Sequence, residues 1–192
     1  MLSSWTIVVP VKGTSAAKSR LGGNDRLAMA MALDTVEAAL AVAPVIVVTS
    51  AAARAAFEQL GARVVSDPGT GLIGAISAGL AGAPGATAVL LGDLPAVRPA
   101  ELAAALDAAA RHPLSIVADA DATGTALAAA TPGAAHALAF GPGSRAAHVA
   151  AGYVELAGEW PGLRRDIDLA EHLDGLSLGP RTAAVLRGHR GD

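Results

Sequence analysis

Cysteine is absent from this chain of 192 residues. The absence excludes disulfide bonds, a thiolate nucleophile, and zinc or iron–sulfur sites built on cysteine. The five histidines show no paired spacing of the kind used by metal sites, and no Gly-x-Ser-x-Gly nucleophile elbow occurs. These gaps argue against zinc enzymes and against serine hydrolases.

Long apolar runs are also missing. Hydrophobic residues make up 53% of the chain, but nearly half of them are alanine, and the longest nearly apolar run, 38–48, contains Pro44. A membrane-spanning helix needs about 18–20 consecutive apolar residues. A strand-like segment begins by Trp5, which leaves no room for a signal peptide. We therefore expect a cytoplasmic protein that does not insert into a membrane.

Lysine is scarce. The chain has 12 arginines but only two lysines, Lys12 and Lys18, and both lie in the loop after the first predicted strand. A compact ammonium group suits a phosphate site. The net charge is −3 and the other basic residues are scattered, so no basic stripe indicates a nucleic acid or an anionic membrane as partner. A small ligand is expected instead.

β-branched apolar runs alternate with alanine-rich stretches of helical period. The predicted strands are 6–11, 45–49, 63–65, 86–91 and 114–118, and the predicted helices are 25–41, 51–60, 72–81 and 99–110. This alternation predicts an α/β fold with a mostly parallel sheet flanked by helices. Continuous apolar strands agree with a sheet that is covered on both faces.

The alternation breaks after residue 120. A short extended piece at 126–130, a helix at 144–151, a strand-like 153–156 and two short helices after Asp168 are interpreted as strands and loops added to the same sheet. No internal repeat or long linker occurs, so residues 1–192 are expected to form one domain. Ligands of such a sheet bind beyond the carboxyl ends of its strands.

The loop that leaves the first strand is cationic and rich in glycine, serine and threonine. It runs from Lys12 to Gly23 and includes Lys18 and Arg20. Its backbone N–H groups and three cations are suited to a triphosphate, although it is not a Walker A loop. An ordinary solvated loop is the alternative.

Carboxylates occupy two positions that the fold brings toward the ligand edge. Asp93 directly follows the strand 86–91, and Asp166 and Asp168 point to one face if their segment is extended. Three carboxylates together could hold one or two divalent ions. The alternatives are a turn aspartate at Asp93 and a helix N-cap at Asp168.

A second glycine-rich segment, Phe140-Gly-Pro-Gly-Ser144-Arg145, precedes an alanine-rich helix. Exposed N–H groups at a helix start favour a substrate phosphate or carboxylate, whereas N-capping by Ser144 is the structural alternative. The segment 122–126 offers hydroxyls and amides of the same kind.

The segment Gly69–Gly74 matches Gly-x-Gly-x-x-Gly, and Asp93 follows at a distance that would suit a ribose contact. This pattern supports an alternative, an NAD(P)-dependent oxidoreductase. Against it, Asp67-Pro68 intervenes between strand and glycines, and the unit is third rather than first in the chain.

Taken together, these segments resemble the guanylyltransferases that make the phosphodiester precursor of the deazaflavin coenzyme F-420. The resemblance covers nearly the whole chain. It is carried by Val-Pro-Val-Lys12…Lys18-Ser-Arg20-Leu, Val-Val-Thr49-Ser50, Gly-Ala-Arg-Val-Val-Ser-Asp67-Pro-Gly, Gly92-Asp93-Leu-Pro, Gly-Thr-Gly-Thr125, Phe-Gly-Pro-Gly-Ser144 and Arg-Arg-Asp166-Ile-Asp168. It implies a nucleotidyltransferase fold related to that of molybdenum-cofactor guanylyltransferases, and a nucleotidyltransferase of that kind is a further alternative.

The resemblance also implies roles for individual residues. The residues that bind the nucleotide would be Lys12, Lys18, Arg20, Asp67 and Gly71. The ligands of Mg²⁺ would be Asp93, Asp166 and Asp168, and the residues around the phosphorylated acid would be Thr125, Ala126, Gly141 and Ser144. The catalytic residues would be Lys18, Arg20 and Asp93. Two positions depart from the family's usual residues. Ile73 stands where asparagine is common, and Ala126 stands where threonine is usual, so a contact there would come from the backbone.

The implied reaction joins GTP and a phosphorylated three-carbon acid and releases pyrophosphate. Family members use phosphoenolpyruvate, 2-phospholactate or 3-phosphoglycerate. The alanine and arginine bias suggests a GC-rich, actinobacterial genome, which favours phosphoenolpyruvate. The implied partners are these small molecules and a downstream transferase of the same pathway; a homodimer would not be unusual for such a domain, and a nucleotide-binding module without turnover stays open.

Overall fold

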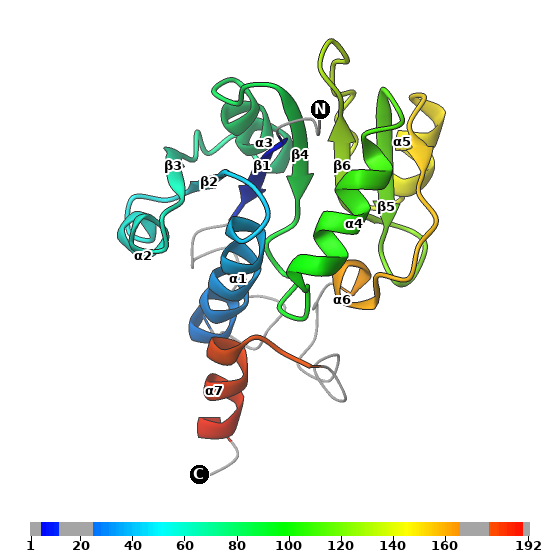
Figure 1. Ribbon diagram of the computed structural model, residues 1–192. Helices are drawn as coiled ribbons and strands as arrows, with labels where there is room; N and C mark the ends of the chain where they lie inside the picture. The colour runs from blue at the N-terminus through cyan, green and yellow to red at the C-terminus, as the bar shows by residue number, and fades with distance from the viewer. Residues whose placement is uncertain (1–4, 12–24, 166–176, 190–192) are drawn as a thin grey trace.

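The computed structural model of the protein describes residues 5–11, 25–165 and 177–189. Within these ranges the core is a seven-stranded sheet of order β3-β2-β1-β4-β6-β5-β7 (Figure 1). The strands are β1 Trp5–Pro10, β2 Val45–Thr49, β3 Arg63–Ser66, β4 Ala86–Leu90, β5 Leu114–Ala118, β6 Thr125–Ala130 and β7 Val154–Glu155. The helices are α1 Asp25–Leu40, α2 Arg54–Gln59, α3 Leu72–Leu80, α4 Pro99–Ala109, α5 Ser144–Ala150, α6 Pro161–Arg164 and α7 Pro180–His189.

One strand of the sheet runs against the others. β6 pairs antiparallel with both β4 and β5, whereas the β1–β2, β1–β4, β2–β3 and β5–β7 pairs are parallel. The amino end of β6 therefore lies at the same edge as the carboxyl ends of the other strands. Consequently Thr125, the first residue of β6, joins the ligand edge of the sheet.

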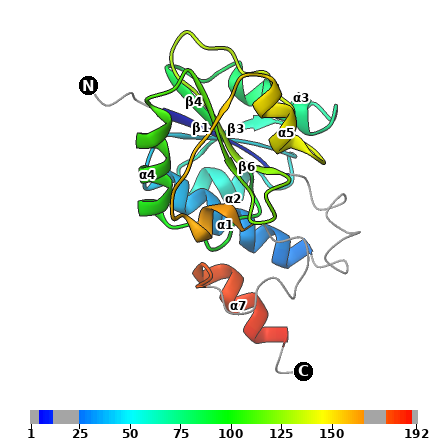
Figure 2. The same ribbon diagram turned by 90° about the vertical axis from the view of Figure 1, so that its right-hand side faces the viewer.

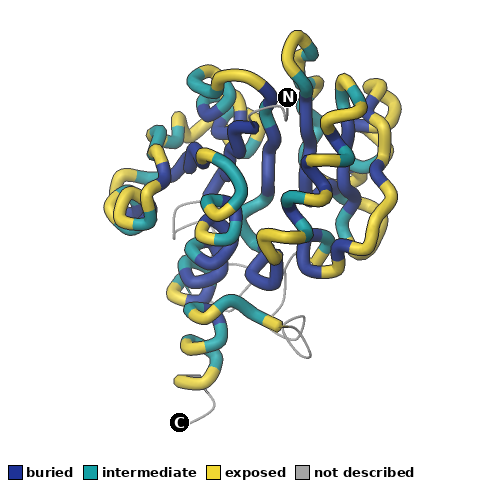
Figure 3. The backbone as a smooth tube through the Cα atoms, in the orientation of Figure 1, coloured by how far each residue is buried: buried dark blue, intermediate teal, exposed yellow. Residues whose placement is uncertain are grey.

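Helices cover both faces of the sheet, as the turned view shows (Figure 2). Successive residues of a strand point to opposite faces of the sheet and pack in different core clusters. Ile7 and Val47 belong to the larger core cluster, which includes Val36 of α1, Phe57 of α2 and Leu102 of α4. Val8 and Val48 pack against α3 on the other side. The buried strands between exposed helix surfaces are evident in Figure 3. Burial on both faces explains why the strands are continuously apolar.

Helix α7 packs beside the first half of α1, beyond the end of the sheet where α1 begins (Figure 1). Its apolar contacts join Leu178, Val185 and Leu186 to Leu27 and Met31. The buried carboxylate of α1's Asp34 holds the amino end of α7. It accepts the backbone N–H of Thr182 at 2.8 Å and the hydroxyl of the same residue at 2.7 Å. This carboxylate thereby fixes the C-terminal helix to the ligand side of the molecule.

The predicted α/β fold with a mostly parallel sheet is confirmed, and the predicted elements within the described residues match the structure to within a few residues. Of the two short helices predicted after Asp168, the described residues contain one, α7, and residues 166–176 lie outside them. Three details differ. Helix α2 begins at Arg54 because residues 51–53 form a turn. Helix α6 was not predicted. The extended piece near 126–130, whose direction was not predicted, is an antiparallel strand inserted into the sheet. Among the described residues, no helix has both the length and the hydrophobicity needed to cross a bilayer.

Candidate active site at the carboxyl edge of the sheet

The turn after β4 carries Asp93 and lies directly against the end of β1. A Cβ built on Gly92 would stand 3.3 Å from the carbonyl oxygen of Pro10, so any larger residue would require the two chain segments to move apart by a few tenths of an ångström. Val11, the next residue after Pro10, is followed by the loop that begins at Lys12. The half-buried Asp93 is therefore adjacent to the point where the chain enters the lysine loop.

The backbone on the far side of Asp93 is held from two directions. The hydroxyl of Thr35 on α1 accepts the N–H of Leu94 at 3.2 Å, and both residues are fully buried. The carbonyl oxygen of Pro95 accepts the N–H of Gly179, which precedes α7, at 2.8 Å. These bonds keep the Asp93 turn in place between α1 and the C-terminal segment.

The start of β6 lies next to this turn. The N–H of Leu91 donates to the carbonyl oxygen of Ala126 at 3.1 Å, which continues the β4–β6 ladder to the residues just before Asp93. Thr125 is thus across from Gly92. The side chain of Ala126 is fully buried in the main core cluster, so the structure leaves only its backbone for the contact expected there.

Thr125 belongs to a buried polar chain that reaches α5. Its Oγ1 is 3.0 Å from Nδ1 of His148 and accepts the hydroxyl of Ser144 at 3.2 Å. The other ring nitrogen of His148, Nε2, accepts the backbone N–H of Ala139 at 3.1 Å. Burial lowers the pKa of His148. Two predicted acid-binding residues, Thr125 and Ser144, are therefore brought into contact.

The glycine loop before α5 does not have the cap predicted as an alternative. Gly143, in the left-handed region at φ 72°, is the N-cap, and Ser144 is the first helical residue with its hydroxyl directed to Thr125. The interpretation of Ser144 as N-cap is thus wrong. The N–H of Ser144 donates to Gly141 and that of Arg145 to Thr123, so these two amides at the start of this short helix are already used. Any anion bound here would have to contact other groups of the loop.

The side chain of Asp119 holds the two ends of the loop between β5 and β6 together. Its carboxylate accepts the N–H of Thr123 at 2.9 Å and that of Gly124 at 2.7 Å. A Cβ on Gly124 would collide with the same carboxylate, which explains the glycine. Asp119 therefore shapes the entry to Thr125, a role that sequence reasoning did not assign.

The predicted nucleoside-binding residues Asp67 and Gly71 lie in the turn between β3 and α3. Oδ1 of Asp67 accepts the N–H of Gly69 at 2.9 Å, and Gly71 is the N-cap of α3 at φ 87°. Because β3 follows β2 at the outer end of the sheet, this turn lies on the side of Asp93 opposite Thr125. The two groups of predicted ligand residues thus flank Asp93 along one edge.

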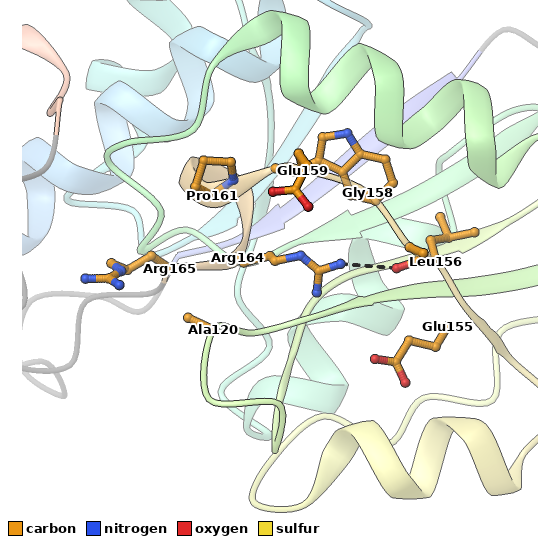
Figure 4. A pocket seen from close by; sticks show the side chains of 10 residues that line it. Ala120, Glu155, Leu156, Gly158, Glu159, Pro161, Arg164 and Arg165 are labelled. Atoms are coloured by element: carbon orange, nitrogen blue, oxygen red, sulfur yellow. Dashed lines mark hydrogen bonds between the residues drawn. The ribbon is translucent and has the colours of Figure 1, made fainter.

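A cavity of about 890 Å³ lies where the chain leaves α6, with Ala120, Glu155, Trp160, Arg164 and Arg165 among its lining residues (Figure 4). The guanidinium of Arg164 donates to the carbonyl oxygens of Ala118 at 3.1 Å and Leu156 at 3.2 Å, and it lies over the ring of Trp160. Arg164 therefore braces the ends of β5 and β7. Arg165 is exposed and immediately precedes Asp166.

The remaining predicted site residues, Lys12, Lys18, Arg20, Asp166 and Asp168, lie outside the described residues. Within the described ranges, no group of three or more histidine, aspartate or glutamate side chains is arranged to hold a metal ion. Asp93 is the one predicted metal ligand that falls inside them, and its carboxylate oxygens are of the type that hard divalent cations prefer.

Residues 15–167 match the MobA-like NTP transferase domain. A protein of Salinispora arenicola named phosphoenolpyruvate guanylyltransferase is 50% identical over 96% of this chain and 94% of its own length. A protein of Mycolicibacterium smegmatis with the same name is 41% identical over 96% of this chain and 91% of its own.

The chain belongs to the phosphoenolpyruvate guanylyltransferase family. It is accordingly a nucleotidyltransferase, as the sequence resemblance implied. Solved structures agree on the fold: a nucleotidyl transferase from Methanothermobacter has a TM-score of 0.58 at 20% identity, covering 98% of this chain and 99% of its own. A Mycobacterium tuberculosis protein solved as a manganese complex has a TM-score of 0.58 at 21% identity, covering 88% and 95%.

Membership of this guanylyltransferase family and the strand order together rule out the oxidoreductase alternative. In a dinucleotide fold the glycine turn follows a central strand, and the acidic residue follows the strand beside it. Here the glycines of 69–74 follow β3, at the end of the sheet. Asp93 follows β4, and two strands, β2 and β1, lie between β3 and β4. The Gly-x-Gly-x-x-Gly match is therefore a coincidence of a turn and a helix start.

Proposed function

We propose that this family member transfers the guanylyl group of GTP to the phosphate of phosphoenolpyruvate, yielding a guanosine diphospho-acid and pyrophosphate for coenzyme F-420 biosynthesis. The observation that carries the proposal is the shared name of relatives that are 40–50% identical over 94% or more of the chain. The arrangement of the sheet edge supports it. Asp93 lies between the glycine turn after β3 and the Thr125 start of β6, so the predicted nucleotide-binding and acid-binding residues come on its two sides along one edge.

The chemistry needs no general base. A phosphate oxygen of the acid attacks the α-phosphorus of GTP, a new P–O bond forms, and the bond to the β-phosphate oxygen breaks as pyrophosphate leaves. The attacking oxygen is already anionic at neutral pH, so no proton has to be removed. The protein has to align two anions that repel each other and to stabilise the negative charge of the leaving group.

The proposal assigns these tasks to the predicted residues. Lys12, Lys18 and Arg20 would neutralise the GTP phosphates, and Asp67 and Gly71 would lie along the nucleoside. Asp93, Asp166 and Asp168 would hold Mg²⁺, which when bound supplies positive charge to the phosphates. Thr35 would keep the Asp93 turn in its position through Leu94.

On the acid side, the proposal places the substrate against the segments that meet at Thr125. Ser144 and the glycine loop at Gly141 come from one side and Thr125 with the backbone of Ala126 from the other. Since the hydroxyls of Thr125 and Ser144 bond to each other, one substrate group placed there would meet both. The cytoplasmic location, a homodimer and delivery of the product to a downstream transferase belong to the proposal on the family resemblance alone.

The test is release of pyrophosphate from GTP with phosphoenolpyruvate, 2-phospholactate or 3-phosphoglycerate, each with and without Mg²⁺. We expect release that requires both Mg²⁺ and an acid, with phosphoenolpyruvate giving the highest kcat/KM. A molybdopterin assay with the same readout covers the related nucleotidyltransferase. GTP binding without turnover with any acid would contradict the proposal.

A further inference from the structure

His148 contacts both segments of the proposed acid site, the start of β6 and the glycine loop before α5. Its ring is fully buried on α5, four residues after Ser144 and on the same helix face. One ring nitrogen contacts Thr125 at the start of β6, and the other contacts Ala139 at the entry to the glycine loop. The ring reaches the proposed acid site only through the Thr125 hydroxyl, so its role in the reaction is one of positioning.

The contacts of His148 fix its tautomer. The N–H of Ala139 can only donate, so the Nε2 atom that it contacts must be unprotonated. In the neutral ring the proton then sits on Nδ1, which donates to Oγ1 of Thr125. Burial, which lowers the pKa of His148, favours this neutral form. The rings of Phe140 and Tyr153 pack edge-on against the imidazole at 5.0 and 4.9 Å and leave it little room to turn.

This tautomer determines what the two hydroxyls can do. Oγ1 of Thr125 accepts from His148 and from Ser144, so its own proton is not used in either bond. In the described part of the chain, no third partner takes that proton. Had His148 carried its proton on Nε2, Nδ1 would have accepted the Thr125 proton instead. The tautomer inferred from these contacts therefore leaves the hydroxyl pair with a spare donor, which is what an anionic substrate requires.

We infer that His148 is a positioning residue for the acid substrate, an inference that rests on the proposed function. Its Nδ1–H keeps the Thr125 and Ser144 hydroxyls oriented as donors. Its Nε2 accepts the N–H of Ala139 and so holds the chain two residues before Gly141, the first glycine of the loop with a positive φ. One imidazole thereby sets both the direction of the donors and the position of the loop.

The experiment measures KM for phosphoenolpyruvate and for GTP in a matched set of variants. His148→Asn retains an amide donor near the position of Nδ1, whereas His148→Gln places its amide near the position of Nε2 and loses the donor to Thr125. His136→Gln is the control, because His136 also joins two segments, through Thr87 at 3.1 Å and Tyr153 at 3.1 Å, without contacting Thr125.

We expect His148→Gln to raise KM for the acid about tenfold, the usual consequence of losing one buried hydrogen bond, while KM for GTP stays within about twofold. His148→Asn should recover most of the loss, and the control should leave both KM values unchanged. An unchanged KM for the acid in folded His148→Gln, or an equal rise for both substrates, would overturn the inference. If His148→Gln does not fold, the inference is tested on the wild-type protein by the protonation state of the His148 ring.

A second measurement separates this inference from the proposed function. Long-range ¹H–¹⁵N NMR on the wild-type protein reports which ring nitrogen of His148 is protonated, whether or not the enzyme turns over. We expect the neutral Nδ1–H form. An Nε2–H or doubly protonated ring at pH 7.5 would overturn the His148 assignment and leave the proposed function standing, whereas an inactive wild type with the Nδ1–H ring would contradict the proposed function alone.

Discussion

The hydroxyl of Thr35 accepts the backbone N–H of Leu94 at 3.2 Å, and Leu94 directly follows Asp93. The same hydroxyl donates to the carbonyl oxygen of Met31 in the preceding turn of α1. A helix that starts at the ligand edge therefore fixes the turn of the proposed metal ligand. The position of the Asp93 carboxylate therefore depends on a buried hydroxyl of α1.

Replacing Thr35 tests how far that packing matters. Thr35→Val keeps the shape but leaves the buried N–H of Leu94 without a partner, which should lower the free energy of unfolding by about 1–2 kcal/mol. The Asp93 turn should also loosen, so the Mg²⁺ concentration for half-maximal rate should rise. Urea denaturation and a Mg²⁺ titration measure the two effects. Thr35→Ser retains the hydroxyl and should restore the Mg²⁺ dependence; if it does not, the hydroxyl is not what holds the turn.

Asp93→Asn tests the proposed metal ligand itself. The amide keeps the size of the side chain, and because Asp93 is only half-buried in a turn we expect the fold to persist, as circular dichroism would report. Turnover should fall by at least about 100-fold, because a neutral oxygen holds a divalent ion poorly. Near-wild-type rates in a folded variant would remove Asp93 from the site.

The attachment of α7 gives a prediction on stability. Asp34 is 2% exposed and accepts bonds from Thr182 and from the side chain of Arg181, whereas Glu37, 50% exposed, contacts the same arginine from the surface. Asp34→Ala should cost about 3–5 kcal/mol of unfolding free energy, since it leaves several buried donors unpaired. Glu37→Gln should cost no more than about 0.5 kcal/mol. Equal losses in urea denaturation would show that burial does not distinguish the two carboxylates.

Stability should decline in mildly acidic solution. Burial lowers the pKa of both His136 and His148 below the ordinary value of 6.5. Below about pH 6.5 the unfolded chain therefore binds protons that the folded chain does not. The free energy of unfolding consequently decreases as the pH is lowered. Each histidine contributes at most about 1.4 kcal/mol per pH unit. Thermal melts between pH 7.5 and 5.5 should show the decline, and His136→Gln should make it shallower; a slope unaffected by that change would contradict the assignment.

Much of the fold was predictable because the strands and helices alternate so regularly. The apolar run at β4, for example, is short and is followed at once by the turn residues Gly92 and Asp93, which favours a buried strand over a helix. The sequence leaves open that β6 inserts between β4 and β5. Its direction was left unspecified, although the six-residue connection 119–124 is too short for a parallel crossover and indicates an antiparallel pair with β5. That direction decides whether Thr125 lies at the ligand edge or at the opposite one.

Within the candidate site, the residue types were predictable but the supporting contacts were not. The order of Asp67, Asp93 and Thr125 along the edge follows from strand order, which the sequence leaves open. His148 showed no metal-ligand spacing, yet it lies four residues after Ser144, and that helical spacing was the available signal. Asp34 stood out only as a charged residue within an apolar helix.

The central claim is that GTP and phosphoenolpyruvate are joined through their phosphates at this edge of the sheet. The most direct measurement is ³¹P NMR of a reaction containing the protein, GTP, phosphoenolpyruvate and Mg²⁺. The account predicts that the phosphoenolpyruvate monophosphate signal is replaced by a pair of coupled diphosphate signals while one equivalent of pyrophosphate appears. A spectrum in which the phosphoenolpyruvate signal persists, with or without hydrolysis of GTP, would contradict it.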